Sequence, residues 1–140
     1  MENKRLVIIK ERTIDNTKDF TGKLLIFTKS CIVKESINAT VIVARENLEI
    51  KGDINLSSSM HVLGNLKAGE INARSVEVDG RTYVKSMRAP GGFKGKGKIV
   101  IEKGGHSGAV DAIARYQFNV HNVELPQEVI AAFPEDYFKC

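Results

Sequence analysis

The residues best suited to chemistry lie between Gly91 and Lys98, in the stretch Gly-Gly-Phe-Lys-Gly-Lys-Gly-Lys. Glycines leave backbone N–H groups accessible to an anion, and the lysines supply the positive charge that attracts phosphate groups. Phe93 could stack on a nucleobase. The spacing matches neither a P-loop nor a dinucleotide-binding fingerprint, so it indicates anion binding without indicating a particular nucleotide.

The positive charge extends upstream of this stretch. Residues 81–98 contain six basic residues and no acidic one, whereas the rest of the chain has 15 basic and 17 acidic residues. We therefore predict an anion-binding or nucleic-acid-binding site that consists of Arg81, Lys85, Arg88, Phe93, Lys94, Lys96 and Lys98. A solvated basic loop without a ligand explains the same composition, and the sequence leaves both interpretations open.

Catalytic and metal-binding patterns are weaker. His106, Ser107 and Asp111 are residue types of a hydrolase triad, but the first two are adjacent and no strand-turn-helix elbow presents the serine. His61 stands between two apolar residues of an expected strand and should face outward. The two cysteines and three histidines lack metal-ligand spacing. We predict no catalytic residue, no metal site and no cofactor.

The elements that would position these residues follow from an internal repeat. Ile37-Asn38-Ala39, Ile54-Asn55-Leu56 and Ile71-Asn72-Ala73 follow one another at intervals of seventeen residues. A fixed period of this kind is typical of repeat architectures. The asparagines could form a ligand-binding ladder, but stacked amides that hydrogen-bond between neighbouring repeats explain them more simply.

Two further rows of apolar residues share this period. The first row comprises Val7 and Ile9, Leu24 and Ile26, Val41 and Val43, Met60 and Val62, and Val76 and Val78. The second comprises Ile14, Cys31 and Val33, Leu48 and Ile50, Leu66 and Ala68, and Val84. The isoleucine motif is the third row, which begins at Phe20 and ends at Met87 or Ala89.

Three short strands per repeat predict a coil with a triangular cross-section. Apolar and polar residues alternate in each row, as expected of strands with one buried face. Stacked coils would form three parallel sheets, with about 4.8 Å between neighbouring strands. A β-sandwich is the alternative, but it does not explain why three rows share one period. We predict an all-β, single-stranded, right-handed triangular β-helix, or β-solenoid, of about 17 residues per coil. The right hand is chosen because the repeat is not a strict hexapeptide.

The β-helix should occupy residues 1–106, with the basic loop inserted at residues 90–98. Ile99 and Ile101 would then resume the first row, 23 residues after Val76. Residues 107–140 should form a short, partly helical C-terminal cap of the same domain, with a helix that has Pro126 in its first turn. No apolar run reaches the roughly 18 residues of a membrane span, so we expect no transmembrane segment. We expect the protein to be cytoplasmic. Cys31 should be buried and Cys140 free.

The repeats resemble those of the bactofilins, which are bacterial polymer-forming proteins. The resemblance covers residues 35–85 and depends on three segments: Leu48-Glu-Ile-Lys-Gly-Asp-Ile54, His61-Val-Leu-Gly-Asn-Leu-Lys-Ala-Gly69 and Val76-Glu-Val-Asp-Gly80. It implies a right-handed triangular β-helix whose open sheet edges dock on further copies. The basic loop and the aromatic-rich tail depart from the bactofilin pattern, and a capped solenoid would form a monomer or a dimer instead of a polymer.

We therefore predict a non-enzymatic β-helical scaffold that forms homo-oligomers, either end to end or through a sheet face. The alternative is a binding module that engages nucleic acid or another polyanion through the Gly-Lys loop. A polysaccharide-active enzyme is a third possibility. It would need acids and bases clustered on one sheet face, and the sequence pattern does not single out such a cluster.

Overall fold

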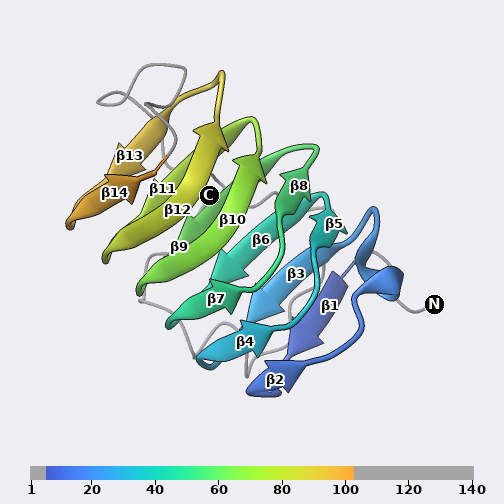
Figure 1. The fold of residues 1–140 in the computed structure, drawn as a ribbon. Helices are drawn as coiled ribbons and strands as arrows, with labels where there is room; N and C mark the ends of the chain where they lie inside the picture. Colours follow the sequence, from blue (N-terminus) through green and yellow to red (C-terminus); the bar gives the residue numbers. More distant parts are fainter. Residues whose placement is uncertain (1–5, 103–140) are drawn as a thin grey trace, which may run out of the picture.

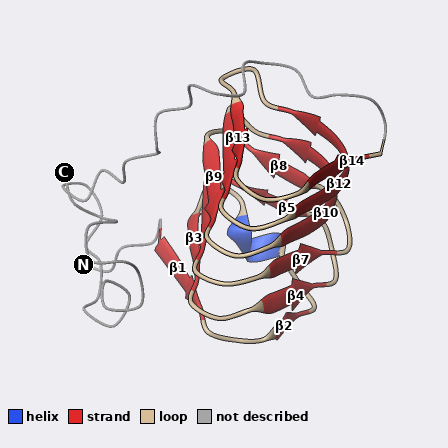
Figure 2. Ribbon diagram, turned by 90° about the vertical axis from the view of Figure 1, so that its left-hand side faces the viewer, coloured by secondary structure: helices blue, strands red, loops and turns tan. Residues whose placement is uncertain are grey.

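The computed structural model describes residues 6–102, which form a β-solenoid with parallel strand pairing throughout. Figures 1 and 2 show successive coils stacked along one axis. The first side of the solenoid is a six-stranded sheet, here called sheet A. Its strands are β1 (Leu6–Ile9), β3 (Leu24–Phe27), β6 (Val41–Ala44), β9 (Ser59–Val62), β11 (Ser75–Val78) and β13 (Phe93–Gly95).

The second and third sides belong to one continuous sheet, here called sheet B. The second side contains β2 (Thr13–Ile14), β4 (Cys31–Val33), β7 (Leu48–Ile50), β10 (Leu66–Asn72), β12 (Thr82–Arg88) and β14 (Ile99–Ile101). The third side contains the 3-10 helix η1 (Lys18–Phe20), β5 (Ile37–Ala39) and β8 (Ile54–Leu56). The long strands β10 and β12 run along both sides, and their second halves extend the third. The predicted β-solenoid is confirmed, and its hand stays a prediction.

The second and third rows of the sequence pattern form columns in the core. Ile37 pairs with Ile54, Ile54 with Ile71, and Ile71 with Met87. The asparagines beside these isoleucines form a column on the exposed outer side. Within it, Asn72 Nδ2 donates a hydrogen bond of 3.5 Å to Asn55 Oδ1. The column is therefore a stack of surface amides.

The first row was predicted on the wrong face in two of its strands. The core column of sheet A contains Val7, Leu25, Ile42, Met60, Val76 and Phe93. Leu24, Ile26, Val41 and Val43 instead point to the outer face of the sheet. The error arose because β3 and β6 are apolar at every position, so alternation gives no sign of which face is inward.

The predicted loop insertion at residues 90–98 is also wrong. Phe93 pairs with Val76 seventeen residues earlier, and Ile99 pairs with Thr82 at the same interval, so the solenoid continues without interruption. The glycines of this stretch fit where coils meet closely. A Cβ on Gly97 would lie 2.5 Å from the carbonyl oxygen of Gly80. They therefore allow the coil to continue, whereas the sequence pattern had suggested an irregular loop.

The remaining predictions concern the C-terminal cap, the buried cysteine and the membrane span. The C-terminal cap at residues 107–140, with its expected helix, lies outside residues 6–102. Cys31 is buried in the core, as predicted. Within the described part of the chain, no helix has the length and apolar character required to cross a membrane.

Candidate functional site

Phe93 does not lie where the predicted anion site requires it. Its side chain is 1% exposed and belongs to the core column of sheet A. It therefore packs against the preceding coil and is not available to stack on a base. Its aromatic type gave a misleading signal, because the sequence pattern placed it in a loop.

The backbone N–H groups of the Gly-Lys stretch are already used by the fold. The Gly91 amide donates to the carbonyl oxygen of Arg74 at 2.6 Å, and the Gly97 amide donates to that of Gly80 at 3.2 Å. The Gly92 and Lys96 amides also donate to backbone carbonyls. The Gly91, Lys96 and Gly97 hydrogen bonds connect the last coil to its neighbour, and the Gly92 hydrogen bond closes a local turn with Ala89. These four groups therefore do not form an anion-binding nest.

The predicted basic residues surround the last two coils and do not form one cluster. Lys94 belongs to sheet A, Arg81 and Lys98 precede β12 and β14 on the second side, and Arg88 ends β12 on the third side. Lys85 is exposed on β12, and Lys96 Nζ lies 3.6 Å from Asp79 Oδ1. Binding of nucleic acid through charge alone stays a prediction, but residues 6–102 do not bring these basic side chains together into one site.

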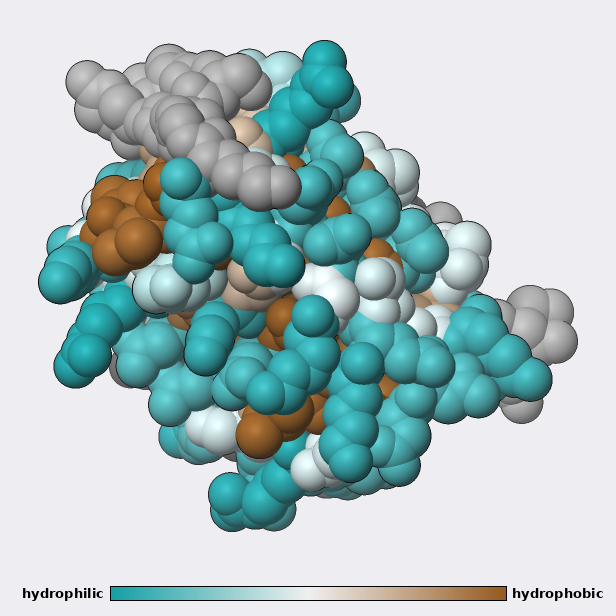
Figure 3. All heavy atoms as spheres, in the orientation of Figure 1, coloured by the Kyte–Doolittle hydropathy of each residue, from teal (hydrophilic) through white to brown (hydrophobic). Residues whose placement is uncertain are grey.

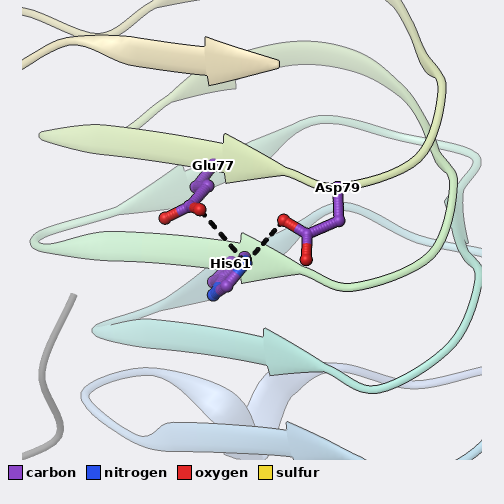
Figure 4. Close-up of side chains that lie close together, drawn as sticks. All are labelled: His61, Glu77 and Asp79. Carbon is purple, nitrogen blue, oxygen red and sulfur yellow. Dashed lines mark hydrogen bonds and ion pairs between the residues drawn. The ribbon is translucent and has the colours of Figure 1, made fainter. Parts of the chain in front are cut away.

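A different cluster forms on the outer face of sheet A, where His61 on β9 meets two carboxylates. His61 Nε2 lies 3.0 Å from Asp79 Oδ1, which accepts a hydrogen bond from the ring N–H. The same nitrogen lies 3.7 Å from Glu77 Oε2. Figure 4 shows both carboxylates directed toward the imidazole. The His61 and Glu77 side chains are buried, at 0% and 5% exposed, and Asp79 is 22% exposed.

The strand register brings these three residues together. His61 and Glu77 are directly paired in β9 and β11, and Asp79 follows the last residue of β11. The same outer column contains apolar residues in the earlier coils, namely Ile26 and Val43. Next to the cluster, the Ser59 and Ser75 hydroxyls lie 2.8 Å apart and hydrogen-bond to each other. The outer face of sheet A thus changes from apolar to polar at β9.

The position of His61 in its strand predicts an outward direction, which the structure confirms, but the sequence pattern does not single out Glu77 and Asp79 as its partners. The signal was present, because Met60 and Val76 are neighbours in the predicted first row. Adding the same step of sixteen residues to His61 leads to Glu77. The period of the apolar residues therefore also relates the two polar residues of this pair.

A shallow groove crosses the outer side of sheet B. It has a volume of about 490 Å³, and its lining includes Arg12, Ile32, Glu49, Lys67, Arg81 and Tyr83. Lys67 Nζ lies 5.8 Å from the centre of the Tyr83 ring, and Tyr83 Oη donates a 2.7 Å hydrogen bond to Glu102. That hydrogen bond raises the pKa of Tyr83. Basic, acidic, aromatic and aliphatic groups are mixed here, so the groove shows no preference for a polyanion.

Neither region has the features of a polysaccharide-cleaving site. The His61 cluster contains suitable acids and a base, but two of its three side chains are buried and closed to a polymer. The groove on sheet B is open, and its one carboxylate on the strands, Glu49, forms an ion pair of 2.8 Å with Lys51. This contact lowers the pKa of Glu49, which is the opposite of what a general acid requires.

Comparison of the chain with protein-family models, with curated proteins and with solved structures gives no match. The architecture itself therefore defines the class of protein, which is a three-sided, parallel β-solenoid.

Proposed function

We propose that this protein is a non-enzymatic structural scaffold whose solenoid associates end to end with further copies. The observation that carries the proposal is the exposure of a core column at the last described coil. Leu66 and Thr82, which precede Ile99 in this column, are each 1% exposed, whereas Ile99 is 43% exposed. The column ends with an apolar side chain that has no coil stacked on it among residues 6–102.

The geometry of a coil explains how a second copy would fit. In a parallel solenoid, each coil offers backbone N–H and C=O groups to the next coil, about 4.8 Å away. Figure 3 shows apolar surface over β14 at this end of the molecule. At the opposite end, Val7 and Ile14 are only partly buried against the core. Head-to-tail stacking would therefore continue the sheets and bury apolar groups from both ends.

A sheet face is the less favoured contact surface. Ile32 and Tyr83 are exposed on the outer face of sheet B, at 39% and 45%. Their row also contains Glu49 and Lys67, which stand between them in the register. These charges would have to lose water in a face-to-face contact, and that desolvation opposes association. The resemblance of residues 35–85 to bactofilins supports end-to-end assembly as well, since that resemblance implies polymer formation.

A pair of isoleucine variants tests the proposal. Ile99→Glu places a charge at the end of the solenoid, and Ile32→Glu places the same charge on a sheet face at similar exposure. We expect wild-type protein to form larger species as its concentration rises, measured by analytical ultracentrifugation and negative-stain electron microscopy. Ile99→Glu should weaken association by roughly tenfold or more, because the contact would bury the new carboxylate. Ile32→Glu should associate like wild type.

Two results would contradict end-to-end association. A wild-type chain that stays monomeric over the whole concentration range would exclude self-association as the function. A chain that dissociates with Ile32→Glu but not with Ile99→Glu would show that the sheet face is the contact surface. Circular dichroism and thermal unfolding of both variants would establish that each is folded.

A further inference from the structure

We propose that His61, Glu77 and Asp79 form a binding site for a divalent transition-metal ion, and that Zn²⁺ fits it best. One donor atom from each side chain lies within 4.8 Å of the other two. Imidazole nitrogen and carboxylate oxygen are both established zinc ligands. The proposed site is separate from the end of the solenoid and does not depend on self-association.

The two separations from His61 Nε2 to the carboxylate oxygens are close to those of a tetrahedral site. Zinc bonds of about 2.0–2.1 Å place two ligand atoms roughly 3.4 Å apart at the tetrahedral angle. The observed distances from His61 Nε2 are 3.0 Å to Asp79 and 3.7 Å to Glu77. An ion between the three groups would therefore require shifts of only a few tenths of an ångström in these two distances.

The hydrogen-bonding capacity of imidazole is a second reason to propose a metal ion at this site. One nitrogen of His61 faces two carboxylates, and its single N–H can donate to Asp79 but is too far from Glu77 Oε2. A metal ion can bind all three groups at once. It would also bring positive charge close to the buried carboxylate of Glu77. Lys96 approaches the Asp79 carboxylate from another direction, at 3.6 Å.

The donor set also selects among metals. Mg²⁺ and Ca²⁺ prefer six or more oxygen ligands, and Cu⁺ prefers sulfur, so one imidazole with two carboxylates favours Zn²⁺ and related ions. Three protein ligands leave a fourth position for water, and the partial exposure of Asp79 provides access from solvent. A bound ion would connect β9 to β11 across the outer face of sheet A, and it should raise the melting temperature.

Calorimetric titration of the full chain, stripped with a chelator, tests the site. Zn²⁺ should bind with one ion per chain, and Mg²⁺ at the same concentration should not. His61→Ala should weaken Zn²⁺ binding by roughly 100-fold or more, because loss of an outer-sphere partner alone costs 10- to 100-fold. Glu77→Gln and Asp79→Asn should weaken it as well. These two changes keep the side-chain shape, so they test the site even if His61→Ala fails to fold.

The other potential zinc ligands provide the control. A variant that combines His106→Ala, His121→Ala and Cys140→Ser keeps the proposed site intact and should bind Zn²⁺ like wild type. The proposal is wrong if wild-type protein binds no Zn²⁺ in the micromolar range. It is also wrong if this triple variant loses binding while Glu77→Gln and Asp79→Asn retain it, because the ion would then bind elsewhere.

Discussion

Sheet A and the second side of the solenoid have the same period but differ in their outer faces. Each residue of β3 and β6 in sheet A is buried, whereas β4 and β7 in sheet B bury only alternate residues. The outer row of sheet B contains Ile32, Glu49, Lys67 and Tyr83 in register, as is typical of a solvated face. The inner faces of both sheets are mostly apolar, with Thr82 as a polar exception in sheet B, so the larger chemical difference lies between the outer faces.

The comparison explains why the polar cluster is found in sheet A. Three of the five buried polar or charged residues within the described part of the chain, Ser59, His61 and Glu77, belong to its outer face. On sheet B, carboxylates such as Glu49 meet solvent and pair with nearby lysines. A polar group on a buried face must find its partners within the protein, and His61 does so in the next coil.

The largest effect should come from placing a charge on each outer face in turn. Ile26 is 0% exposed on sheet A, and Ile32 is 39% exposed on sheet B, so Ile26→Glu and Ile32→Glu form a matched pair. Ile26→Glu should lower the free energy of unfolding by roughly 4 kcal/mol, since it buries a carboxylate. Ile32→Glu should change it by less than about 0.5 kcal/mol. Urea unfolding measures both, and equal losses would refute the difference between the two faces.

An intermediate effect is expected when a native carboxylate is removed from each face. In the presence of a chelator, Glu77→Ala should lower the free energy of unfolding by roughly 2–3 kcal/mol, because it removes a buried group that contacts His61. Glu49→Ala removes a surface ion pair with Lys51 and should cost at most about 0.5 kcal/mol. Chemical denaturation measures the free energy of unfolding of both variants. If Glu77→Ala proves as mild as Glu49→Ala, the buried cluster contributes no stability.

The smallest effect concerns the inner face of sheet B, where Cys31 lies. Burial, together with the nearby negative charge of Glu11, raises the pKa of its thiol from 9.0 to about 11. Above pH 9 the unfolded chain releases this proton while the folded chain keeps it, so stability should fall between pH 9 and about 11.

Subtracting the pH profile of Cys31→Ala isolates this contribution from the lysines and tyrosines that titrate in the same range. In Cys140→Ser, the remaining thiol should react slowly with a thiol reagent at pH 8 and rapidly after unfolding. Fast reaction in the folded state would show that the inner face of sheet B is not closed to solvent.

Much of this fold could be predicted from the sequence alone, because stacked coils repeat their chemistry at a fixed interval. The seventeen-residue step places Ile37, Ile54 and Ile71 in one column, and the structure confirms that column and the second row. The same spacing also predicts part of the candidate site, since His61 and Glu77 are separated by one step of the repeat. Asp79 is not separated from His61 by one step of the repeat, so its place in the cluster does not follow from the period.

The repeat in the sequence determined the coil, its three sides and the stacking of like residues, because these depend only on spacing. The tertiary structure alone decided which face of β3 and β6 points inward, since both faces are apolar and alternation cannot distinguish them. It also decided that Phe93 continues the core, because the glycines beside it allow coils to approach more closely than a side chain would permit. In both cases packing against the neighbouring coil determines which side chains point inward. The residues of a single coil do not specify that packing.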